Sequence, residues 1–172
     1  CGAVVAYKLV LALVAPMQGV NWQQVMESEM VLELLEFAAF ATIGDVMELR
    51  DENRIIVKEG LELMKHTRNT GLEALIRATG TDPEHIKPYT IGFVLGPCLN
   101  ATGRLDTADH ALALFEAEDT AEAARIAGDL KDMNDSRKEL TLAGVEEAIA
   151  QIEGSNLEKD DVLVVYLPDV HE

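Results

Sequence analysis

A long run of residues in the last third of the chain carries apolar side chains at helical spacing. The apolar positions recur at steps of three or four residues, with some gaps: Ile126, Leu130, Met133, Leu140, Ile149 and Ile152. This period predicts one long helix over 119–154. The heptad pattern is too imperfect for a free coiled coil, so we expect the helix to pack on one domain and to connect it to the next.

The residues before this segment also predict helices. Residues 2–15 are apolar on most sides, which predicts a buried helix that ends at Pro16 and is covered by other protein. Ser28 is a candidate cap for a second apolar helix, because its hydroxyl can accept hydrogen bonds from free amides of the first turn. Glu33 and Glu36 are expected to mark the solvent-facing edge of that helix.

Two segments depart from the helical pattern. Three glycines and a proline interrupt YTIGFVLGPCLNATGRL, which predicts a tightly placed loop with short regular pieces. The segment DDVLVVYLPDV predicts a β-strand over 161–168 that is apolar enough to be buried on both faces. Because a single strand is not stable alone, this one is typical of the first strand of a further domain.

The composition is strongly acidic, but the charge is uneven. The 172 residues include 31 Asp and Glu against 14 Lys and Arg, and the 48% of hydrophobic residues excludes a disordered acidic tail. The formal charge of −17 divides into −4 over residues 1–104 and −13 over residues 105–172. This excludes a nucleic-acid binder whose affinity comes from overall positive charge, but it leaves room for a polyanion site in the first part.

The two cysteines indicate a reducing compartment. Cys1 and Cys98 form neither a disulfide framework nor a CxxC zinc motif, so we expect a reduced, cytoplasmic chain. The apolar stretch from Leu9 to Ala15 is much shorter than the roughly 20 residues that cross a membrane. No membrane partner is therefore expected.

Asp45 is the first candidate for chemistry, because it lies between apolar neighbours at the predicted end of an apolar helix. A buried carboxylate without a partner is costly, so two interpretations remain open. The side chain caps the next segment, or it is one of several ligands of a hard divalent cation. No other ligands are evident close to it in the sequence.

The segment LGPCLNATGRL is the second candidate, because it combines Asn100, Gly103 and Arg104 in one glycine-rich turn. A guanidinium group can form two parallel hydrogen bonds with a phosphate, and backbone amides near Gly103 can add others. A turn in which Arg104 pairs with the acidic face of the chain is an equal alternative. The histidines are scattered without the spacing of a metal site: His66, His85, His110 and His171.

Five stretches, taken in order, resemble the RecJ single-strand-specific exonucleases of the DHH phosphoesterase superfamily: CGAVVAYKL, ELLEFAAFATIGDVMEL, ENRIIVKEGLELM, IGFVLGPCLNATGRLDTA and LKDMNDSRKEL. The combination of the GDV segment with the LNATGRL segment is the specific part of this resemblance. The Asp-His-His triplet that names the superfamily is absent from the sequence, and we expect it to precede Cys1. The chain is thus expected to be an internal fragment of a RecJ-like enzyme.

The resemblance implies that the chain is a mainly α-helical fragment of an α/β DHH phosphoesterase. The implied domains are the C-terminal part of the catalytic lobe over 1–118, a long connecting helix over 119–154, and the start of the second lobe over 160–172. The implied activity is hydrolysis of phosphodiester bonds in single-stranded DNA. It uses two divalent metals, Mn²⁺ or Mg²⁺, whose site is mostly supplied by residues outside this chain.

The resemblance also implies roles for individual residues. Asp45 matches a metal-binding aspartate, and Arg104 matches a catalytic residue of the same centre. Asn100, Gly103 and Arg104 match the motif that contacts the DNA phosphate near the scissile bond. His171 matches the start of a glycine-rich phosphate motif in the second lobe.

The departures from the family pattern set the expectations for the isolated chain. Cys98 stands where many relatives carry a basic residue, which is expected to weaken one phosphate contact. With a single ligand aspartate, the chain alone is expected to be inactive and to need the missing N-terminal part of the enzyme. The apolar helix over 2–15 and the strand without a partner could be buried in a homo-oligomer of the isolated chain. Two alternatives remain: a DHH-family phosphodiesterase acting on short oligonucleotides or cyclic dinucleotides, and a non-catalytic acidic helical module that binds a basic partner.

Overall fold

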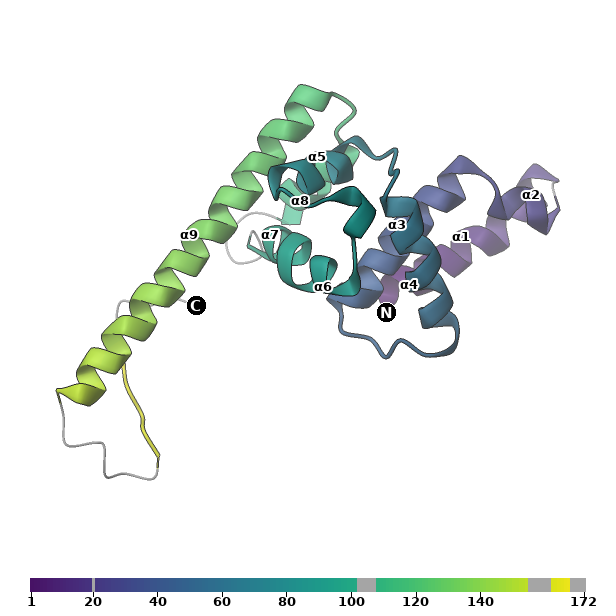
Figure 1. The fold of residues 1–172 in the computed structure, drawn as a ribbon. Coiled ribbons are helices and arrows are strands. Elements are labelled where there is room, and N and C mark those ends of the chain that lie inside the picture. The colour runs from purple at the N-terminus through teal and green to yellow at the C-terminus, as the bar shows by residue number, and fades with distance from the viewer. Residues whose placement is uncertain (20, 102–107, 155–161, 168–172) are drawn as a thin grey trace. The chain divides into compact units, whose positions relative to one another are not determined.

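A computed structural model describes residues 1–19, 21–101, 108–154 and 162–167 (Figure 1). The chain divides into two units, Cys1–Lys131 and Asp132–Glu172, each of which is described by itself. The described residues are mainly helical: α1 (Gly2–Gln18), α2 (Trp22–Met26), α3 (Glu29–Gly44), α4 (Asp51–Met64), α5 (Thr70–Ala78), η1 (Pro83–His85), α6 (Pro88–Thr90), η2 (Ile91–Leu95), α7 (Gly96–Asn100), α8 (Ala108–Glu116) and α9 (Thr120–Glu153). None of the helices of the described residues is both long enough and apolar enough to cross a membrane.

Helix α1 is longer and less buried than the sequence predicts. It continues through Pro16 to Gln18 and ends at Gly19, whose φ is +63°. Pro16 costs one helical hydrogen bond and its ring crowds the carbonyl four residues earlier, but only two residues of the helix follow it. Val4 and Tyr7 are buried, but another side of the helix leaves four apolar side chains between 49% and 80% exposed: Val5, Leu9, Leu13 and Met17.

Helices α3 and α4 form the centre of the first unit, and α1 packs on α3. At the crossing of α3 and α4, a Cβ built on Gly60 would lie 2.3 Å from the Cβ of Ala39, so only glycine allows this approach. Ser28 precedes α3 as predicted, but its hydroxyl donates to the carbonyl of Val25 at 2.7 Å and forms no cap hydrogen bond. The predicted N-cap position of Ser28 is therefore confirmed, and the predicted hydrogen bond from a first-turn amide to its hydroxyl is wrong.

Helices α5 and α8 make a second close contact. A Cβ on Gly71 would lie 1.8 Å from the carbonyl oxygen of Leu114, so the two backbones nearly touch. Asn69, which is 8% exposed, joins this contact to α3. Its side-chain oxygen accepts from the amide of Leu72 and caps α5, and its Nδ2 donates to Oε1 of Glu33 and to the carbonyl of Phe115.

The segment from Pro88 to Asn100 is helical throughout, although its glycines and proline predict a loop. Five residues of it, Ile91–Leu95, form a π-helix between α6 and α7. Pro97 lacks an N–H group and its ring crowds the carbonyl four residues earlier, so a wider turn before it relieves the clash. The amide of Gly96 then donates to the carbonyl of Ile91, five residues earlier.

The long helix predicted over 119–154 is confirmed as α9. Asp119 begins it, because its Oδ1 accepts from the amides of Ala121 and Glu122 at 2.9 and 2.8 Å. In the first unit this helix buries four side chains: Ala123, Ile126, Ala127 and Leu130. The predicted strand over 161–168 is not confirmed, because residues 162–167 carry no strand and an isolated strand lacks a partner.

Candidate metal and phosphate site

Asp45 lies at the carboxyl end of α3, where its backbone amide donates to the carbonyl of Ala41 at 2.8 Å. The residue is exposed, and its carboxylate forms no hydrogen bond or ion pair with the described residues. It does not cap the next helix either, since the residue that precedes α4 in the N-cap position is Arg50. Of the two interpretations left open by the sequence, capping of the next segment is therefore wrong.

The backbone directly after Asp45 is strained. Val46 has φ +53°, which is rare for a β-branched residue. Its amide donates to the carbonyl of Ile43, and the amide of Met47 donates to the carbonyl of Thr42. These two bonds define a Schellman motif, in which glycine usually occupies the position of Val46. The turn therefore holds Asp45 at a fixed place on the surface at a cost in conformational energy.

The structure describes the phosphate motif as far as Ala101, and of the candidate site residues in this motif the described part contains Asn100. This residue is the last of α7 and is exposed. Cys98, two residues earlier, is 1% exposed and donates its thiol hydrogen to the carbonyl of Val94 at 3.3 Å, so its side chain points into the core. Gly103 and Arg104 lie outside the described residues, as does His171, so their predicted roles stay predictions.

No described residues assemble a complete metal site. Groups of three or more His, Cys, Asp and Glu side chains able to hold an ion are absent from the described ranges. His85 binds Asp82 at 2.7 Å, and this hydrogen bond lowers the pKa of the Asp82 carboxyl below its ordinary value. Both groups are exposed, so this pair is a surface contact and not a catalytic dyad.

Glu36 is buried, so the expectation that it marks the solvent-facing edge of α3 is wrong. It is 5% exposed and does not lie on the solvent-facing edge of α3; its Oε2 atom has no hydrogen-bond partner among the described residues. Burial raises the pKa of Glu36, a hydrogen bond from Thr67 lowers it, and the charge of Glu33 raises it further. The signal for this burial is absent from the local sequence, because Thr67 follows the next helix.

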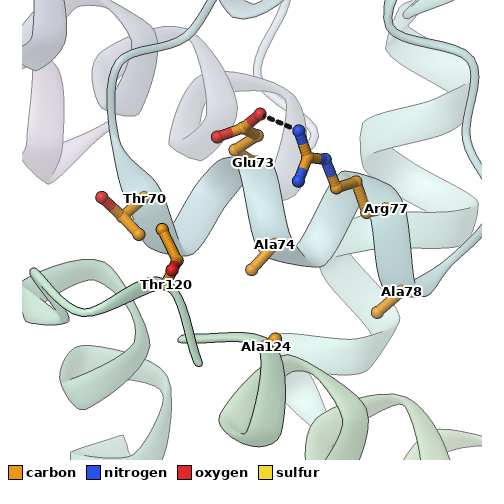
Figure 2. A pocket seen from close by; sticks show the side chains of 7 residues that line it. All are labelled: Thr70, Glu73, Ala74, Arg77, Ala78, Thr120 and Ala124. Atoms are coloured by element: carbon orange, nitrogen blue, oxygen red, sulfur yellow. Dashed lines mark hydrogen bonds and ion pairs between the residues drawn. The ribbon is translucent and has the colours of Figure 1, made fainter. Parts of the chain in front are cut away.

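A pocket of about 300 Å³ lies between α5 and the start of α9 (Figure 2). Small side chains and one pair of charged side chains line it: Thr70, Glu73, Ala74, Arg77, Ala78, Thr120 and Ala124. Glu73 and Arg77 pair with each other at 2.6 Å along one edge. Asp45 and Asn100, the candidate site residues within the described part of the chain, do not line this pocket.

Comparison with known proteins identifies the relatives of this chain. No family model matches it. The protein named single-stranded-DNA-specific exonuclease RecJ from Bacillus subtilis (strain 168) is 36% identical over 163 residues, which are 95% of this chain and 19% of that protein. The protein of the same name from Dickeya dadantii (strain 3937) is 31% identical over 177 residues, 99% of this chain and 31% of that protein.

Solved structures agree with these relatives. The crystal structure of RecJ from Thermus thermophilus in complex with Mn²⁺ matches with a TM-score of 0.67 at 31% identity, covering 91% of this chain and 21% of that one. The Mg²⁺ complex from the same organism matches with a TM-score of 0.70 at 33% identity, covering 86% and 22%.

These matches show the class of protein: the chain is a relative of exonucleases specific for single-stranded DNA. Within that class the relatives are RecJ proteins, and the resemblance drawn from the sequence is confirmed. The chain spans 19% and 31% of the two curated relatives described above.

Proposed function

We propose that this chain is part of a RecJ-like exonuclease that hydrolyses phosphodiester bonds of single-stranded DNA with divalent metal. The observation that carries the proposal is the match to RecJ proteins at 31–36% identity over 95–99% of this chain. The match in fold, with TM-scores of 0.67 and 0.70, supports it.

The proposal assigns successive parts of the chain to the two lobes of the enzyme and the helix that connects them. Residues 1–118 belong to the catalytic lobe, residues 119–154 connect the lobes, and residues 160–172 begin the second lobe. The chain by itself is inactive, because Asp45 is the one metal ligand that the resemblance assigns to it. The remaining ligands come from a part of the enzyme that precedes Cys1.

The geometry at the end of α3 fits a metal ligand. Asp45 is exposed and its carboxylate is unpaired within the described residues, so both oxygens are free to coordinate a hard cation. The hydrogen-bonded turn at Val46 and Met47 fixes the backbone that carries it. A Mn²⁺ or Mg²⁺ pair, when bound, activates water and stabilises negative charge on the attacking and leaving oxygens.

The other assigned residues act on the DNA. The guanidinium of Arg104 neutralises an oxygen of the phosphate and positions the strand. Asn100, exposed at the end of α7, and the backbone near Gly103 donate hydrogen bonds to the same phosphate. His171 adds a contact to a phosphate from the second lobe.

The decisive variant is Asp45→Asn in the full-length protein that carries this chain. Exonuclease activity on single-stranded DNA should fall on the order of 100-fold or more, because loss of a metal ligand exceeds the 10–100-fold cost of losing a ligand's supporting partner. Higher Mn²⁺ concentration should restore part of the activity. Glu48→Gln is the matched control, because Glu48 is an exposed carboxylate in the same connection and pairs with Arg50.

Equal activity of Asp45→Asn and the wild type would refute the metal role of Asp45. The claim that the 172 residues alone are inactive has its own test. The isolated chain is incubated with Mn²⁺ and single-stranded DNA, and robust cleavage that Asp45→Ala abolishes would overturn that claim. A preference of the full-length protein for cyclic dinucleotides over long single strands would assign it to the related phosphodiesterases.

A further inference from the structure

Two aromatic rings on the surface of the first unit are stacked on each other. Tyr89 in α6 and Phe93 in η2 have ring centroids 4.8 Å apart and planes inclined by 23°. Both residues are 68% exposed. Offset stacking is a favoured arrangement of aromatic rings, so an exposed ring face can take a further planar ring in the same way.

The helical path of this segment explains the arrangement. Residues four apart on a helix lie on the same face, so a helical Pro88–Asn100 segment brings Tyr89 and Phe93 together, whereas a loop would not. The same period continues through Pro97 toward Asn100, which is exposed at the end of α7. The stacked rings therefore lead along one helical segment to the first residue of the phosphate motif.

The stretch of sequence that carries the rings lacks acidic residues, which favours an anionic ligand over a cationic one. The sequence has no Asp or Glu between Glu84 and Asp106, although the chain as a whole contains 31 of them. Lys87 and Arg104 are the Lys and Arg residues of that interval. Lys87, which precedes α6 directly, forms no ion pair with the described residues, unlike Lys65, which pairs with Glu62, or Arg77, which pairs with Glu73.

We propose that Tyr89 and Phe93 form a stacking platform for the bases of a single-stranded nucleic acid, next to the phosphate motif that begins at Asn100. The inference rests on the proposed function and names the part of the strand, the base, that this surface binds. Single-strand channels combine cations that follow the backbone with aromatic faces that take successive bases of any sequence. Lys87 supplies the charge and the two rings supply the faces.

The test distinguishes contacts with the bases of a strand from contacts with its phosphates. Binding of the full-length protein is measured by fluorescence anisotropy in EDTA, so that hydrolysis does not consume the probes. One probe is a labelled oligothymidylate, and the other is a strand of equal length with abasic sites in place of the bases. Tyr89→Ala and Phe93→Ala should each bind the oligothymidylate about tenfold more weakly, a value within the range for one stacked base. Neither change should weaken binding of the abasic strand.

Three controls sharpen this comparison. Tyr89→Phe and Phe93→Tyr keep a ring at each position and should bind both strands as the wild type does. Trp22→Ala removes an exposed aromatic residue from α2, which lies well apart from α6 (Figure 1), and should change neither affinity. The alanine variants remove no charge, so they should keep the wild-type slope of binding against salt concentration, whereas Lys87→Gln should reduce that slope.

The outcomes distinguish this inference from the proposed function. If the wild type binds the oligothymidylate and both alanine variants bind it equally well, the platform is refuted and the exonuclease proposal stands. Equal losses on both strands would also refute it, because the rings would then act through the fold or the phosphates. If the wild-type protein binds no single strand at all, the proposed function fails and the platform fails with it.

Discussion

The helix crossings of the first unit and the exposed end of α3 differ in how well the residue present suits the local backbone. At the crossings the chain places glycine wherever a Cβ would collide, at Gly60 against Ala39 and at Gly71 against Leu114. At the end of α3, a left-handed residue is required, and valine stands where glycine would fit without strain. The interior is thus fitted for stability, and the surface next to Asp45 is not.

The same contrast holds between two helix ends. Helix α1 ends at Gly19 with φ +63°, and the turn after α3 passes through Val46 with φ +53°. The backbone geometry is almost the same, but only the first end uses the residue that adopts it readily. Among the described residues, two exposed non-glycine residues have a positive φ, Val46 at +53° and Asp51 at +46°. The first lies directly beside the carboxylate of Asp45, and strain kept at that place points to a positional requirement there.

The largest effect on stability is expected at the interior. Gly71→Ala would place a Cβ 1.8 Å from the carbonyl oxygen of Leu114, and a backbone atom cannot move aside cheaply. We expect a loss of about 3 kcal/mol or more in the free energy of unfolding, at the upper end for overpacked sites. Chemical denaturation followed by circular dichroism measures it.

Gly128→Ala is the matched control for that change. Gly128 lies within α9, and a Cβ there would meet no heavy atom within 4 Å. Alanine at this position should raise stability by up to about 1 kcal/mol, because it has the higher helix propensity. Equal effects of the two substitutions would contradict the claim that the contact of α5 with α8 requires glycine.

The sequence predicts the element that depends on local period. The long helix α9 follows from apolar residues that recur at steps of three or four. The segment that begins at Tyr89 is predicted from its glycines and proline to be a tightly placed loop with short regular pieces, whereas Pro88–Asn100 is helical. A π-helix accommodates Pro97 without breaking the helical path, and propensity alone does not signal it.

The candidate site was predictable only in part, for a physical reason. Asp45 could be singled out because it follows an apolar helix, but its exposure depends on how the turn after α3 closes. Glu36 was expected at the surface because a glutamate in a helix is usually solvated. Its burial arises from Thr67 and from packing by segments distant in the sequence, which no local pattern contains.

A smaller effect, which depends on pH, is expected at Glu36. Burial raises the pKa of its carboxyl in the folded chain above the ordinary glutamate value, so the folded chain holds the proton to higher pH than the unfolded chain does. The free energy of unfolding should therefore fall as pH rises from the ordinary glutamate range through the raised pKa, and then level off. Glu36→Gln removes this ionisation and should be more stable than the wild type at neutral pH, because it carries no buried charge.

Denaturation of both proteins between pH 4 and neutral pH, a range set by the ordinary glutamate pKa, measures the difference. The two curves should converge at the acid end, where the carboxyl is protonated in both states. Glu59→Gln changes an exposed glutamate that pairs with Lys58, and should alter stability little at any pH. A constant difference between wild type and Glu36→Gln across the range would show that charge burial is not its cause.

The smallest effect is expected from exchanging the residues at the two helix ends. Val46→Gly should stabilise the chain by about 1 kcal/mol. Relief of the left-handed strain at a residue with a Cβ is worth about 1–2 kcal/mol. Part of this is lost because glycine raises the conformational entropy of the unfolded chain. Little packing is lost, because Val46 is 88% exposed. Gly19→Val, at the end of α1, should lose a similar amount, although a Cβ there would meet no heavy atom within 4 Å. Thermal denaturation of both variants measures the exchange.

The exchange also tests whether strain at Val46 serves Asp45. In the full-length protein, Val46→Gly should raise the Mn²⁺ concentration needed for half-maximal exonuclease activity, because a relaxed turn holds the carboxylate less firmly. Gly19→Val should leave that concentration unchanged while it lowers stability. If Val46→Gly gains stability and keeps the wild-type metal requirement, the strain is only a local cost of this sequence, and the contrast between the two helix ends has no bearing on the metal site.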